Sequence, residues 1–249
     1  MLHTFIKKIA PVAAMAMAFG VAGCDGVDIK INDTEGVPLA ELDMSGDPPT
    51  EVVLAGPDNV IISDGDTLDI QVEGDEDAVA ALRFSLEDGT LGIHREKDGW
   101  DGKGTATVNV TMPSPEELVI AGSGSLEAAS LAGKSSVTIA GSGSAATKSV
   151  SADKLEVTVA GSGTYTAGGT AKSLELTVAG AGSAKMAGLK SESAEVTIAG
   201  SGSAEFASDG EVDANIVGSG DVTVTGDATC TVSSIGSGRV KCQTVREEE

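Results

Sequence analysis

The chain has 249 residues, a formal net charge of −22 at pH 7, 33 glycines and an aromatic content of only 2%. This acidity repels nucleic acids and anionic lipid headgroups, so neither is expected as a direct ligand. A β-sandwich of this size would bury many more aromatic rings, so the composition predicts a narrow core of Val, Ile, Leu and Ala.

The first 23 residues have the layout of a secretory signal peptide. Lys7 and Lys8 precede an apolar stretch shorter than the ~20 residues of a membrane-spanning helix, and small residues then lead directly to Cys24. This arrangement resembles the lipobox of bacterial lipoproteins, which implies that Cys24 is lipidated; an ordinary secretory signal with an incidental cysteine is the alternative. A lipid at Cys24 would anchor the protein to a membrane of the cell envelope, with its domain in the periplasm. Asp25 resembles an inner-membrane retention signal, but that rule transfers poorly between bacteria, so the choice of membrane stays open.

Two sections of different character follow. Residues 24–50 are acidic and contain Pro48-Pro49, which predicts a flexible tether between the membrane and the folded domain. Residues 51–113 contain segments with strand patterning, and residues 76–82 are predicted to form one short helix. The dipeptides Asp64-Gly65 and Asp88-Gly89 indicate tight turns between strands. We expect this section to form the first, irregular turns of the domain and to cap its open end.

Residues 114–245 contain a tandem repeat, in which a Gly-Ser-Gly or Gly-Ala-Gly triplet recurs at intervals of 18 to 20 residues. Periods near twenty residues are typical of solenoids, in which each repeat forms one rung, meaning one turn of the coil. A sharp corner between stacked strands needs backbone angles and close approaches that a Cβ would obstruct. The predicted corner glycines are Gly122, Gly124, Gly141, Gly143, Gly161, Gly163, Gly180, Gly182, Gly200, Gly202, Gly218, Gly220, Gly236 and Gly238.

The residues around each triplet alternate with a period of two, as expected for strands with one buried face. In one repeat, Val157 and Val159 are predicted to face inward, Thr158 between them to face outward, and Tyr165 beyond the corner to face inward again. The pattern predicts an all-β fold, a single-stranded parallel β-helix over residues 51–245. The handedness rule for parallel crossovers favours a right-handed coil. Residues 246–249 form a charged tail.

The chain resembles the head GIN domain family of autotransporter-type adhesins, a bacterial domain family of unknown function. The similarity lies in an acidic hairpin region at residues 64–72, a Gly-Thr-Leu-x-Ile strand at residues 89–93, a Val-x-Met-Pro step at residues 110–113, and the glycine triplets. It covers residues 51–245 and implies a parallel β-helix on the cell envelope. The family name suggests adhesion, although no autotransporter barrel follows the repeats here.

No catalytic constellation is present in the sequence. His94 is the one histidine that remains after the signal peptide, and a solvated position in a strand is expected for it. There is no Gly-x-Ser-x-Gly elbow and no third glycine of a dinucleotide-binding loop. The three cysteines do not have the spacing of a zinc site. We therefore expect no cofactor, no metal and no enzymatic activity.

The function that these observations favour is that of a non-catalytic envelope lipoprotein, structural or adhesive, with an unidentified envelope glycan or protein as its ligand. The alternative is a carbohydrate-active enzyme, because parallel β-helices include polysaccharide lyases and hydrolases. Such enzymes need clustered carboxylates or basic groups and aromatic platforms for the sugar. Trp100 is the lone candidate platform, since Tyr165 and Phe206 fall in inward positions.

Cys230 and Cys242 are the thiols that remain once Cys24 is modified, and an exported domain lies in an oxidising compartment. Cys230 lies six residues before the last triplet and Cys242 six residues after it, both in inward positions. If the glycine corner folds the rung back on itself, the two cysteines lie opposite each other and can form a disulfide. Two buried free thiols are the alternative. A wider, three-walled rung would separate their Cα atoms by more than the ~7 Å that a disulfide can bridge.

Overall fold

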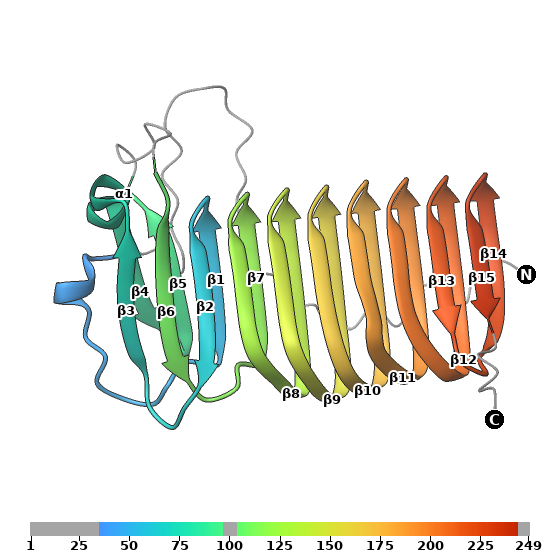
Figure 1. Ribbon diagram of the computed structural model, residues 1–249, viewed down its shortest axis with the longest axis horizontal. Helices are drawn as coiled ribbons and strands as arrows, with labels where there is room; N and C mark the ends of the chain where they lie inside the picture. The colour runs from blue at the N-terminus through green and yellow to red at the C-terminus, as the bar shows by residue number, and fades with distance from the viewer. Residues whose placement is uncertain (1–34, 97–103, 244–249) are drawn as a thin grey trace, which may run out of the picture.

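The computed structural model describes residues 35–96 and 104–243, and the signal peptide, Cys24, Asp25, Trp100 and the charged tail lie outside them. The described chain forms a parallel β-solenoid, as the repeat predicts (Figure 1). The elements that begin it are η1 (Leu39–Glu41), β1 (Glu51–Gly56), β2 (Asn59–Asp64), β3 (Asp69–Gly74), α1 (Glu76–Ala81), β4 (Leu82–Glu87), β5 (Thr90–Arg95), β6 (Ala106–Met112) and β7 (Glu117–Gly122). The regular rungs follow as β8 (Ser125–Gly141), β9 (Ser144–Gly161), β10 (Thr164–Gly180), β11 (Ser183–Gly200), β12 (Ser203–Gly218), β13 (Asp221–Thr225), β14 (Thr229–Gly236) and β15 (Arg239–Gln243).

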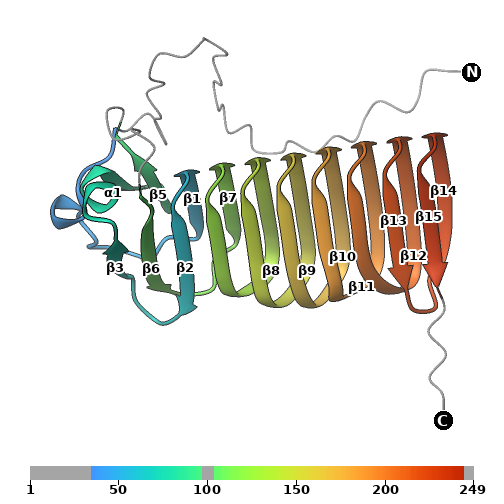
Figure 2. The same ribbon diagram turned by 45° about the horizontal axis from the view of Figure 1, so that its top comes forward.

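Each rung is a flattened loop with two walls. The strands β8 to β12 each run from one glycine corner, around a bend at the opposite side, and back to the next corner, so that successive rungs stack in parallel (Figure 2). The alternating apolar residues line the interior, and the columns predicted to face inward are buried from rung to rung. The two aromatic residues of the repeat, Tyr165 and Phe206, are fully buried and fill the narrow core between the walls.

Glycine is required at the corners for two different reasons. Gly141 has a φ of +121°, and a Cβ there would lie 2.5 Å from the carbonyl oxygen of Gly122 on the preceding rung. Gly143 has an ordinary backbone conformation, but its Cβ would lie 2.7 Å from the carbonyl oxygen of Gly124 and 2.8 Å from Cγ2 of Ile120. The corners are also linked directly, because the carbonyl of Gly122 accepts the amides of Ser142 and Gly143, each at 2.9 Å.

The order of rungs at the N-terminal end differs from their order in the sequence. The first rung of the chain, β1–β2, lies between the β5–β6 rung and the β7–β8 rung and pairs in parallel with both. Beyond this rung, β4 pairs antiparallel with β5, and β3 pairs antiparallel with β6 (Figure 1). These two strands form the N-terminal end of the solenoid. Asp64-Gly65 lies in the short connection between β2 and β3, as predicted, but these two strands are not paired with each other, because β6 lies between them. Asp88-Gly89 does connect the antiparallel pair β4–β5.

The segment after residue 34 is ordered against this cap. Val37 forms a two-way backbone bridge with Phe84 at 2.8 Å, and Leu39 and Leu42 pack on the hydrophobic core. The prediction of a flexible tether up to residue 50 is therefore wrong for this part, since apolar side chains within the acidic segment find partners on β4 and the cap.

The C-terminal end carries the predicted disulfide. Cys230 on β14 and Cys242 on β15 are bonded, with their Cα atoms 6.6 Å apart. The glycine corner at Gly236 thus folds the last rung into two facing walls, as the equal spacing of the cysteines requires.

Candidate functional site

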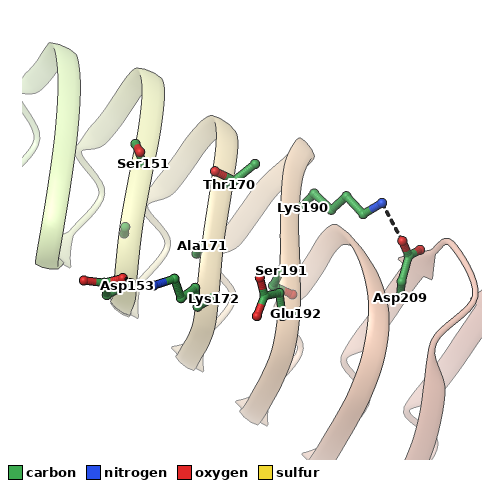
Figure 3. Close-up of a pocket in the computed structure, with 10 residues that line it drawn as sticks. Ser151, Asp153, Thr170, Ala171, Lys172, Lys190, Ser191, Glu192 and Asp209 are labelled. Carbon is green, nitrogen blue, oxygen red and sulfur yellow. Dashed lines mark ion pairs between the residues drawn. The ribbon is translucent and has the colours of Figure 1, made fainter.

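A shallow groove of about 520 Å³ lies on the bends of β9 to β12, on the side of the solenoid opposite the glycine corners. It crosses successive rungs, so its lining comes from equivalent positions of the repeat (Figure 3). The lining residues are Ser151, Ala152, Asp153, Thr170, Ala171, Lys172, Lys190, Ser191, Glu192 and Asp209.

The groove forms where the inward residues are small and the register changes. The inward column at the bend consists of Ala152, Ala171, Ser191 and Ser208, which are all small and buried. Between β11 and β12 the register shifts after Met186, because the β12 rung is shorter than the one before it. The extra residues 187–189 of β11 therefore bulge beside the groove.

Ion pairs between neighbouring rungs hold the charged side chains of the groove. Lys172 Nζ on β10 lies 2.6 Å from Asp153 Oδ1 on β9, and Lys190 on β11 pairs with Asp209 on β12 (Figure 3). The hydrogen bonds within these pairs raise the pKa of both lysines and lower the pKa of both aspartates. All four side chains are exposed, so these ion pairs fix the positions of the charged groups but contribute little to the stability of the fold. Exposed hydroxyls of Ser151 and Thr170 lie beside them.

The two aspartates of the groove differ from the carboxyl pair that glycoside cleavage uses. A glycosidase needs a general acid whose pKa is raised, near a second carboxylate. The groove aspartates have lowered pKa values instead. Among the described carboxyl groups a raised pKa is resolved for Glu117, through burial and then through the charge of Glu51, but Glu117 lies on the wall formed by β7. No three His, Cys, Asp or Glu side chains within residues 35–96 and 104–243 gather to hold a metal ion.

The predicted solvated position of His94 is wrong. The imidazole is only 2% exposed, because the segment containing Gly36 crosses over it. Its Nε2 lies 3.0 Å from the carbonyl oxygen of Glu35, which can only accept, so Nε2 carries the proton. Nδ1 has no hydrogen-bond partner in the described part, and burial lowers the pKa of the ring. His94 thus holds the N-terminal segment against β5.

Tyr165 is equally unavailable as a sugar platform. It lies inside the core, its hydroxyl donates to Thr147 Oγ1 at 3.1 Å, and burial raises its pKa to about 12.

The threonines predicted to face outward form a half-exposed or exposed column that is in register from rung to rung. They are Thr138, Thr158, Thr177 and Thr197. No helix in the described part is long and apolar enough to cross a bilayer.

The stacked parallel rungs place the chain among the β-solenoid proteins. More specifically, the chain belongs to the family described as "Putative auto-transporter adhesin, head GIN domain", whose sequence pattern matches residues 48–228. This confirms the resemblance noted from the motifs. None of the curated proteins matches the sequence.

Solved structures of proteins from Bacteroides and Parabacteroides share the fold. A putative adhesin from Bacteroides fragilis is 19% identical, with a TM-score of 0.69 over 80% of this chain and 93% of its own. A putative adhesin from Parabacteroides merdae is 20% identical, with a TM-score of 0.62 over 80% and 93%. A putative lipid binding protein from Parabacteroides distasonis is 24% identical, with a TM-score of 0.60 over 80% and 94%. At these identities the similarity demonstrates the fold alone.

Proposed function

We propose that this protein is a non-catalytic, adhesin-like component of the cell envelope, anchored by a lipid on Cys24, that binds a glycan through the groove on β9 to β12. The observation that carries the proposal is the lining of the groove. Hydroxyls of Ser151 and Thr170 alternate with ion-paired lysines and carboxylates, which offer donors and acceptors together. A hydroxyl-rich chain that crosses several rungs matches such a lining, and the two lysines and two aspartates of the groove are held in ion pairs.

Family membership and the Cys24 motif support the location. The family is named for adhesins, which act at the cell surface, and small residues lead to Cys24 as they do before a lipidated cysteine. A lipid ligand, which the name of the Parabacteroides distasonis protein suggests, is less suited to this chain. Side chains such as Tyr165 and Phe206 fill the interior of the described rungs and leave no space there for an acyl chain.

The test is a binding screen of the mature domain against envelope polysaccharides, followed by two matched variants. Thr170→Trp places a bulky ring in the groove, whereas Thr177→Trp places the same ring on the flat wall of the same strand. We expect at least a tenfold loss of glycan affinity for Thr170→Trp and little change for Thr177→Trp. Absence of glycan binding, equal losses in both variants, or release of shortened sugar products would each contradict the proposal.

A further inference from the structure

The two ends of the solenoid are closed in different ways. At the N-terminal end, the antiparallel strands β3 and β4 and the helix α1 cover the β5–β6 rung (Figure 1). At the C-terminal end, β14 pairs with β12 and β15 pairs with β13, and no other described strand pairs with either. Each of these two strands therefore presents one unpaired edge, which is a template for another strand.

Exposed apolar side chains gather at the same end. Val232 is 49% exposed, Ile235 71% and Val217, the partner of Ile235 on β12, 56%. Of the five large hydrophobic residues exposed in the described part, these are three. The Cys230–Cys242 bond ties β14 to β15, so the two edges are held together as one end face. An ordered, partly apolar end loses little conformational entropy when it pairs with another surface.

The charge of this end distinguishes it from the chain as a whole. The chain has a net charge of −22, but residues 228–243 contain no acidic residue. β14 carries no charged side chain, and β15 carries Arg239 and Lys241. Two copies of a strongly acidic protein repel each other at most surfaces. Within the described residues, β14 and β15 carry no carboxylate that would oppose a second copy.

We propose that two copies of this chain associate end to end through their last rungs, with β14 of each copy paired antiparallel to β15 of the other. β14 and β15 run in opposite directions on the two walls of the last rung (Figure 1). A twofold axis parallel to the strands exchanges the two walls and keeps the direction of each strand, so β14 of one copy faces β15 of the other in an antiparallel arrangement. Pairing β15 with β15 would place the Arg239 and Lys241 side chains of the two copies opposite each other, and like charges in that position are destabilising. Pairing β14 with β15 places them opposite uncharged residues.

The test uses the chain without residues 1–23 and with Cys24→Ala, which keeps every described strand and removes the lipid site. Sedimentation equilibrium over a range of concentrations measures the dimer dissociation constant, and added salt should tighten the dimer because it screens the net charge. Ser233 is an exposed, outward-facing residue of β14, and Thr197 occupies the same column on β11. Substitutions at Thr197 are therefore matched controls.

Ser233→Lys places a cation opposite the cationic strand of the partner, twice per dimer, so we expect dimerisation about fivefold weaker. Ser233→Glu should tighten it, and both charge changes at Thr197 should have less than about a twofold effect. A monomer at all concentrations would overturn the proposal, as would equal effects at the two positions. Weakening by both Ser233 variants would overturn the pairing of β14 with β15. A dimer that forms only after deletion of residues 244–249 would identify that segment as the occupant of the edge and would also overturn the proposal.

Discussion

The corner glycines predict a large difference between two alanine substitutions on the same strand. Gly180 on β10 has a φ of +114°, and a Cβ there would lie 2.5 Å from the carbonyl oxygen of Gly161 and 3.2 Å from its carbonyl carbon. Gly168 on the same strand has an ordinary φ, and its nearest neighbours to a Cβ would be two carbonyl oxygens at 3.6 Å. Gly180→Ala therefore forces both an unfavourable backbone conformation and an overlap with the neighbouring rung. Gly168→Ala does neither.

The backbone strain at Gly180→Ala costs roughly 1–2 kcal/mol and the overlap a similar amount, so we expect a destabilisation of about 3 kcal/mol. In a domain of this size that corresponds to a fall in Tm of about 6–12 °C. Gly168→Ala should be neutral or stabilise by up to about 1 kcal/mol, because it restricts the unfolded chain. Thermal unfolding followed by circular dichroism compares the two. Equal Tm values, or a lower Tm for Gly168→Ala, would refute the assignment of strain to the corners.

Three further predictions concern other parts of the chain. Cys24→Ala should move the protein from membranes to the soluble fraction and abolish labelling by a fatty-acid analogue; unlabelled wild type would contradict lipidation. Reduction of the Cys230–Cys242 bond should weaken the last rung by about 3 kcal/mol, seen as faster amide exchange in residues 229–243 with the central rungs unchanged. Because the folded state raises the pKa of Glu117, ionisation of this carboxyl opposes folding at neutral pH. Glu117→Gln should therefore be more stable than wild type by about 0.5 kcal/mol at pH 7, and the difference should vanish as the pH falls and Glu117 protonates.

Much of the fold could be predicted because each repeat contains local sequence patterns that determine its structure. The period of two identifies the buried face, the triplets identify the corners, and the equal spacing of Cys230 and Cys242 from the last corner predicts their bond. The order of the first rungs could not be predicted. β1 has apolar residues that suit any parallel neighbour, and its position between β5 and β7 depends on the whole cap.

The groove was also missed by sequence reasoning, because its residues fall in what the pattern indicates as a polar turn. Two signals were present in retrospect. The inward positions Ala152, Ala171 and Ser191 are smaller than those on the flat walls, and Lys172 lies one repeat after Asp153. Burial of His94 had no local signal at all, since it depends on a segment that lies 59 residues earlier in the chain.

The way in which the corner ladder ends explains a buried ion pair near the cap. Where the β5–β6 rung departs from the repeat, the Asp58 carboxylate replaces the glycine contacts of the corner. It accepts Arg95 Nε at 2.8 Å, Arg95 Nη2 at 2.6 Å and the amide of Ala106 at 2.8 Å. Both side chains are at most 3% exposed, so loss of either partner would leave a buried charge, at a cost of about 3–5 kcal/mol.

The N-terminal end of the solenoid thus has a buried ion pair and antiparallel strands. The C-terminal end has a disulfide that orders the last rung but leaves its strand edges unpaired within the described chain. The strands at that end are uncharged in β14 and cationic in β15, and this composition supports association of two copies of an acidic chain through these two strands.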